Sequence, residues 1–149
     1  MTRDPRRANP KTSRTQRGVL ELVPHRPPLC LLDRVTAFAD GRLTCAAEVQ
    51  SDCPLLVDGA LPGWALVEHV AQAAAALRGI EAPNAAQSPG YLVAVQQAEL
   101  DVDTLRTGTV LEVTVWREGR PRGGLAQLRG EVSAQGSVLC RAGITVREK

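Results

Sequence analysis

Residues 61–79 read Leu61-Pro62-Gly63-Trp64-Ala65-Leu66-Val67-Glu68-His69-Val70-Ala71-Gln72-Ala73-Ala74-Ala75-Ala76-Leu77-Arg78-Gly79. This stretch predicts one helix, because Pro62 suits the first helical position and Gly79 suits the end of a helix. Its apolar side chains occur on every face, which predicts burial on most sides. Many of them are alanines, and small side chains let a sheet approach closely. The stretch therefore predicts a central helix wrapped by a curved sheet.

Strand-like runs are expected on both sides of this helix. Two precede it and are joined by Asp40-Gly41, a strong hairpin turn signal. Four follow it in what the spacing predicts to be a meander. The expected strands are 29–39, 42–50, 91–100, 110–117, 125–134 and 138–146. A hairpin, one helix and then a run of strands predict an α+β domain with an antiparallel sheet.

Composition and charge favour one globular domain at 18–149 behind a basic leader at 1–17. The chain has 149 residues, of which 44% are hydrophobic and 23% charged. The leader carries a net charge of +5, and residues 18–149 carry −3. The leader is expected to be disordered or to serve as an arm for an acidic partner. No apolar run reaches the roughly 18 residues of a membrane span. Two Trp, one Tyr and one Phe leave little for stacking on nucleic-acid bases.

The cysteine and histidine content predicts neither a metal site nor a disulfide framework. No cysteine pair has the spacing of a zinc site or a redox motif, and two histidines are too few for a His-rich centre. The predicted compartment is therefore the reducing cytoplasm.

The central helix carries the first candidates for chemistry. Trp64, Glu68 and Gln72 are spaced four residues apart and form one stripe, whereas His69 lies about 100° around the helix from Glu68. A carboxylate on a buried helix is costly unless it is paired or used. Glu68 is thus either a general acid or base, or a group that faces a solvent groove or pairs with an arginine. Gln72 has the alternative role of satisfying backbone groups.

Two further candidates come from the backbone around them. Gly63 has no side chain, so a ligand is expected to reach its N–H at the helix start, where a carbonyl oxygen that gains negative charge would be stabilised. His25 lies within Pro24-His25-Arg26-Pro27-Pro28, whose prolines make a rigid mount for an imidazole. The alternative for Gly63 is that it only marks the start of the helix. The alternative for the segment around His25 is that it only covers the edge of the core.

Two motifs together resemble one known family. Residues 24–35 read Pro24-His25-Arg26-Pro27-Pro28-Leu29-Cys30-Leu31-Leu32-Asp33-Arg34-Val35 and resemble the opening of the hot-dog-fold 3-hydroxyacyl-acyl-carrier-protein dehydratases. The stretch 61–73 resembles their central helix, on which Glu68 takes the place of the catalytic carboxylate. The resemblance covers about residues 18–147 and implies a hot-dog fold, a curved antiparallel sheet around one long helix.

One departure points to a subgroup. The dehydratases place a catalytic histidine in the loop before the helix, but here that loop, residues 54–63, is shorter and has no histidine. Trp64 and the later Gly90-Tyr91-Leu92-Val93 resemble instead the divergent dehydratase-like proteins of aryl-polyene gene clusters.

The catalytic imidazole of the family has no counterpart here, so His25 is our candidate to replace it, and Gly63, Trp64 and Gln72 are the candidate substrate-binding residues. The resemblance implies that Glu68 is the catalytic carboxylate. It implies at least a dimer, either a homodimer or a heterodimer with a related dehydratase, and an acyl carrier protein as partner. No cofactor is expected beyond the phosphopantetheine or coenzyme A that carries the substrate. Arg117, Arg120 and Arg122 are candidates for docking an acidic carrier protein. The function predicted is dehydration of 3-hydroxyacyl thioesters in fatty-acid or polyketide-type biosynthesis; a non-catalytic helper subunit and a hot-dog thioesterase are the alternatives.

Overall fold

The computed structural model describes residues 18–85 and 90–148, and it builds them into one helix against one large sheet. The leader predicted at 1–17 lies outside the described residues. The elements in chain order are the 3-10 turn η1 (Val19–Glu21), β1 (Arg34–Ala39), β2 (Arg42–Glu48), β3 (Ala60–Pro62), α1 (Ala65–Glu81), η2 (Pro83–Ala85), β4 (Tyr91–Leu100), β5 (Thr104–Arg106), β6 (Val110–Arg117), β7 (Leu125–Ala134) and β8 (Ser137–Arg147). Within the described residues, no helix is long and apolar enough to cross a membrane.

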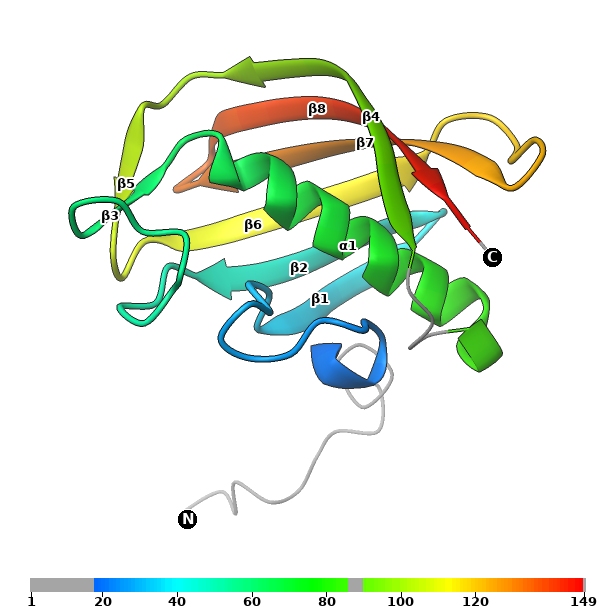
Figure 1. Cartoon of the computed structure of the whole chain (residues 1–149), viewed down its shortest axis with the longest axis horizontal. Helices are drawn as coiled ribbons and strands as arrows, with labels where there is room; N and C mark the ends of the chain where they lie inside the picture. The colour runs from blue at the N-terminus through cyan, green and yellow to red at the C-terminus, as the bar shows by residue number, and fades with distance from the viewer. Residues whose placement is uncertain (1–17, 86–89, 149) are drawn as a thin grey trace, which may run out of the picture.

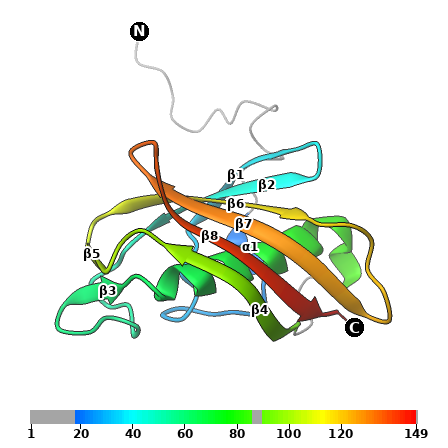
Figure 2. The ribbon, with the colours of Figure 1, turned by 90° about the horizontal axis from the view of Figure 1, so that it is seen from above.

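The large sheet is antiparallel and has the order β1-β2-β6-β7-β8-β4. Figure 1 shows α1 lying across one face of this sheet, and Figure 2 shows the sheet curving over it. The predicted meander holds for β6, β7 and β8 but is wrong for β4, which pairs with β8 at the far edge. The short strands β3 and β5 form a separate pair near the start of α1.

The predicted hairpin turn is confirmed, since Asp40 and Gly41 both have positive φ, at 54° and 73°. The first strand begins at Arg34 rather than at residue 29, because side-chain contacts from α1 hold the preceding backbone. The short strand β5 was not predicted, and its three residues carry too little pattern for a strand assignment.

Both predicted ends of the helix are wrong. The helix begins at Ala65, because residues 60–62 pair with β5 as strand β3 and Pro62 belongs to that strand. It continues past Gly79 to Glu81. Gly79 is explained by packing instead: a side chain there would collide with the backbone carbonyl of Leu22, so the glycine lets η1 lie directly on the helix.

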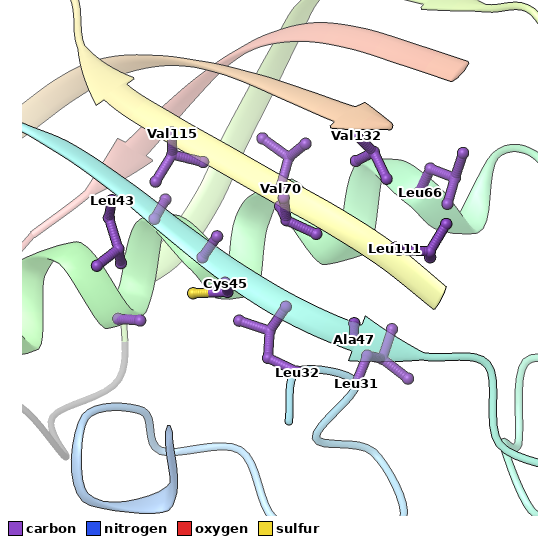
Figure 3. Packing of buried hydrophobic residues seen from close by; sticks show 14 of the residues in the cluster. Leu31, Leu32, Leu43, Cys45, Ala47, Leu66, Val70, Leu111, Val115 and Val132 are labelled. Carbon is purple, nitrogen blue, oxygen red and sulfur yellow. The ribbon is translucent and has the colours of Figure 1, made fainter. Parts of the chain in front are cut away.

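The core lies between α1 and the concave face of the sheet, and it is built from Leu, Val and Ala as the composition predicts. Alternate residues of the central strands point inward, as in β2, where Leu43, Cys45 and Ala47 are buried. Figure 3 shows Val70 of α1 packed under β6 and β2, with Val115 close by. The buried helix predicted from the sequence is confirmed: eleven of its residues are buried.

Candidate active site

The structure brings the two predicted catalytic side chains together. Nε2 of His25 lies 3.8 Å from Oε1 of Glu68, and the two side chains are 32% and 40% exposed. They line a cavity of about 210 Å³, whose walls continue along α1 and the start of β4. Glu68 therefore faces an open cavity rather than the core, which allows a carboxylate on this helix without a buried ion pair.

The histidine reaches this position because its backbone is held at several points. Nη1 of Arg26 donates hydrogen bonds to the carbonyls of Val23 and His25, at 2.9 and 2.8 Å. The N–H groups of Leu29 and Cys30 both donate to the Arg26 carbonyl. These contacts, together with the prolines, make 23–30 a compact turn that presents the imidazole to the helix. Sequence reasoning missed the role of Arg26, because the contact depends on the turn itself.

Gln72 is the link between this turn and the helix. Its Oε1 accepts a hydrogen bond from the N–H of Leu31 at 2.8 Å, and its Nε2 donates to the carbonyl of Leu29 at 2.8 Å and to Oε1 of Glu68 at 3.0 Å. The residue is 1% exposed and does not line the Glu68 cavity. Substrate binding by Gln72 stays a prediction. The contacts show the alternative role, in which Gln72 satisfies backbone groups. It also orients the Glu68 carboxylate.

The Gly63 N–H donates to the carbonyl of Asp103 at 2.8 Å, so in this structure it is not free for the ligand contact that the sequence predicts. A side chain at Gly63 would collide with the carbonyl of Val102, so the glycine allows the chain after β4 to pass close to the helix start. Trp64 is 57% exposed and does not line the Glu68 cavity. No structural contact supports its predicted substrate binding.

His69 lies on another side of the helix, as its spacing from Glu68 predicts. Its Nδ1 is 2.9 Å from the carbonyl of Ala65, and the residue is 3% exposed. Burial lowers the pKa of its imidazole, since the charged form is poorly solvated there. It lines a second cavity that shares no lining residue with the Glu68 cavity.

The walls of the Glu68 cavity were not predicted. They include Ala71 and Ala75, which lie three and seven residues beyond Glu68 on the same helix face, and Leu92 and Val146 from β4 and β8. The helical spacing of the two alanines could have identified them. The strand residues could not be found in this way, because the pairing of β4 with β8 brings distant parts of the chain together.

Charged groups beyond the cavity have mainly structural partners. Arg117 donates to Glu81 at 2.7 Å and to Glu148 at 2.8 Å, which ties the end of α1 to β6 and to the C-terminal end of β8. Arg117, which the sequence offered as a docking candidate, is therefore held in ion pairs within the chain. The other two candidates, Arg120 and Arg122, are exposed. Among the described residues, no group of three or more His, Cys, Asp or Glu side chains could hold a metal ion.

A long helix packed on a curved antiparallel sheet, with an acidic residue beside a histidine at a cavity, defines a hot-dog domain of the dehydratase class. The family model for ApeP-like proteins, described as ApeP dehydratase, matches residues 18–149. The chain therefore belongs to the ApeP-like dehydratase family.

Similar proteins agree with this assignment. A 3-hydroxyacyl-[acyl-carrier-protein] dehydratase FabZ from Nitrosospira multiformis is 31% identical, over 88% of this chain and 95% of its own length. Among solved structures, the dehydratase heterocomplex ApeI:P from Xenorhabdus doucetiae matches with a TM-score of 0.79 and 26% identity, over 89% of this chain and 91% of that chain. The TT0310 protein from Thermus thermophilus matches with a TM-score of 0.61 and 22% identity, over 84% of this chain and all of that chain, which shows the shared fold. The chain is thus a dehydratase-type hot-dog protein of fatty-acid or polyketide-type biosynthesis.

Proposed function

We propose that this protein dehydrates 3-hydroxyacyl thioesters carried on the phosphopantetheine arm of an acyl carrier protein, with Glu68 and His25 as its acid–base pair. The observation that carries the proposal is the 3.8 Å approach of His25 Nε2 to Glu68 Oε1 at a cavity that both residues line. No other cofactor takes part in the proposed reaction.

The chemistry needs one base and one acid on the same substrate. Neutral His25 takes the proton from C2 of the thioester, and the electron pair of that C–H bond forms the C2–C3 double bond as the C3–O bond breaks. Protonated Glu68 gives its proton to the leaving hydroxyl, which departs as water. The products are a 2-enoyl thioester and water, and a proton passing from His25 to Glu68 restores both groups.

Three features of the site support this proposal. Nδ1 of His25 is buried without a hydrogen-bond partner among the described residues, so nothing in that part of the chain fixes the imidazole in one tautomer. Gln72 donates to the Glu68 oxygen that faces His25, which holds that oxygen toward the imidazole. The alanines beyond Glu68 give the acyl chain an apolar wall along the helix, and the charged residues Arg78 and Glu148 also line this cavity.

We further propose that the protein acts as a dimer through β4, either with a second copy or with a related dehydratase. All ten residues of β4 are exposed, and the strand is an edge of the sheet. Tyr91, Leu92, Val93 and Val95 are between 44% and 53% exposed. A long apolar edge strand invites pairing with another chain. The similar solved structure is a dehydratase heterocomplex, ApeI:P, which supports a heterodimer.

Exposed Arg120 and Arg122 are our candidates for docking the acidic carrier protein. The four cysteines are all free thiols, which suits the reducing cytoplasm as the place of action.

The test of catalysis compares matched variants on a 3-hydroxyacyl-carrier-protein substrate, with enoyl product followed by mass spectrometry. Glu68→Gln should abolish dehydration, because an amide keeps the shape but does not exchange the proton. His25→Ala should lower the rate about 10²-fold or more. Glu112→Gln, an exposed residue on the sheet, is the control and should keep full activity. Full activity in Glu68→Gln would reject the site.

The test of assembly is sedimentation at micromolar concentration. Val93→Lys in β4 should convert a dimer to a monomer of 15.9 kDa, whereas Val110→Lys, an equally apolar exposed position outside β4, should not.

The loop 54–63 lacks a histidine, which favours the helper role as the second candidate. Two results together would establish that helper role. The parent chain would be inactive alone but needed by a co-expressed dehydratase, and the activity of that pair would survive Glu68→Gln in this chain.

A further inference from the structure

A cavity larger than the Glu68 cavity lies on another side of α1, away from the proposed active site. It has a volume of about 330 Å³, opens to solvent, and is lined by η1, the segment after the proline-rich turn, the end of β2 and the loop that follows it. We call it the β1-edge cavity, because Asp33 and Glu48 place it beside the β1–β2 edge of the sheet, whereas the Glu68 cavity is lined by β4 and β8. Figure 1 shows these edges on opposite sides of α1. A volume above roughly 300 Å³ is in the range of small-molecule sites.

A deeply buried acceptor faces this cavity. Nδ1 of His69 lies 2.9 Å from the carbonyl of Ala65, and a carbonyl only accepts, so Nδ1 carries the hydrogen. Burial keeps the imidazole neutral at pH 7 by lowering its pKa. Nε2 is then a free acceptor, and it accepts no hydrogen bond from any residue that the structure describes. His69 Nε2 is not among the fully buried atoms that lack a partner, so a donor that enters the cavity, from water or from a ligand, can reach it.

The charged side chains that line the cavity are all acidic, and the Arg26 guanidinium acts on the Cys30 thiol in its wall. Asp33, Glu48 and Asp52 line it, and none of the described lining residues is Lys or Arg. The Asp33 carboxylate is one of the charges that act on the His69 imidazole. An anionic ligand, such as the phosphate end of a phosphopantetheine arm, is therefore repelled here, and a cation is favoured.

The remaining walls are apolar. They include Val19, Leu31, Leu32, Val49 and Leu61, with two prolines from the turn. A ligand that fills the space needs an apolar body of moderate size beside its charged donor.

We propose that the β1-edge cavity is a second binding site, for a small primary amine with an apolar body, whose ammonium group donates to Nε2 of His69 and faces Asp33. This site is separate from the proposed dehydration site and does not depend on it. The amine occupies the space between η1 and the loop after β2.

The test uses three probes of the same shape that differ in charge and donor: 2-phenylethylamine, 2-phenylethanol and 3-phenylpropanoate. Calorimetry on the full chain at pH 7.5 should show the amine binding about tenfold or more tightly than the alcohol, and no binding of the carboxylate. The chain has two histidines, so NMR of the imidazole nitrogens distinguishes the cavities. The His69 signals should move and those of His25 should not.

Variants complete the test. His69→Leu should weaken amine binding about tenfold or more. Because a core substitution can disturb folding, Asp33→Asn is the second variant: it keeps an acceptor for the Glu48 N–H and should weaken the amine about fivefold. His25→Ala is the control and should bind the amine as the parent does. Equal binding of amine and alcohol, a shift at His25 instead of His69, or no binding of any probe would overturn the proposal.

Discussion

Replacing Gln72 by Met should both destabilise the protein and disturb its acid–base pair. Met has a similar volume and shape but offers no strong acceptor or donor. The buried N–H of Leu31 would lose its partner, at a cost of about 1–3 kcal/mol, and the half-buried carbonyl of Leu29 would lose a hydrogen bond worth about 0.5–1.5 kcal/mol. The free energy of unfolding should therefore fall by about 2–4 kcal/mol.

For a domain of this size, each kcal/mol corresponds to about 2–4 °C in Tm, so we expect a decrease of roughly 5–12 °C. Differential scanning calorimetry at one fixed protein concentration measures it, since dimerisation makes Tm depend on concentration. The value of kcat/KM should fall about tenfold or more, because the turn that carries His25 is no longer held against the helix and the Glu68 carboxylate loses its donor.

Glu68→Gln is the matched control for stability. Its amide oxygen still accepts from Nε2 of Gln72, so its Tm should stay within about 1 °C of the parent while its activity is lost. A Gln72→Met protein with the Tm and activity of the parent would refute the role that we assign to Gln72 in anchoring the turn.

Three other predictions concern packing and titration. Gly130→Ala should lower the free energy of unfolding by about 1–3 kcal/mol in urea titrations, because a Cβ there would lie 2.5 Å from Cγ1 of Val70; a neutral effect would show that the core has room. Since the pKa of His69 in the folded protein is below its ordinary 6.5, the unfolded chain takes up a proton first as the pH falls. Stability should therefore decrease by about 1.4 kcal/mol per pH unit from pH 6.5 down to the folded pKa, and His69→Leu should remove this component of the profile. Burial raises the pKa of Cys45 to about 12 and that of Cys140 to about 11, so neither should react with a maleimide at pH 8 until the protein is unfolded; fast labelling of either in the native protein, read by mass spectrometry, would contradict the structure.

Helix periodicity, turn chemistry and two short motifs were enough to predict the fold class and the catalytic candidates from the sequence. The alanine-rich pattern at 61–79 predicted a buried central helix, and Asp40-Gly41 predicted a hairpin, because both signals depend on neighbours in the chain. Glu68 could be chosen because a carboxylate on a buried helix is costly unless it is paired or used in chemistry. Its angular separation from His69 follows from helix geometry alone.

Only the tertiary structure decided which side chains share a cavity and which backbone groups are already used. Gly63 and Gly79 looked like marks of the helix ends, but each allows a close approach of a carbonyl from elsewhere in the chain, from Val102 and from Leu22. From the sequence, Gln72 was a candidate for substrate binding, but the fold places the backbone groups of Leu29 and Leu31 beside it, and its side chain bonds to both. The sequence determined the central helix and the six longer strands, apart from some of their ends, because these elements follow from local periodicity and turn geometry. Hydrogen bonds between residues about forty positions apart, and pairings such as that of β4 with β8, depend on contacts that no local pattern encodes.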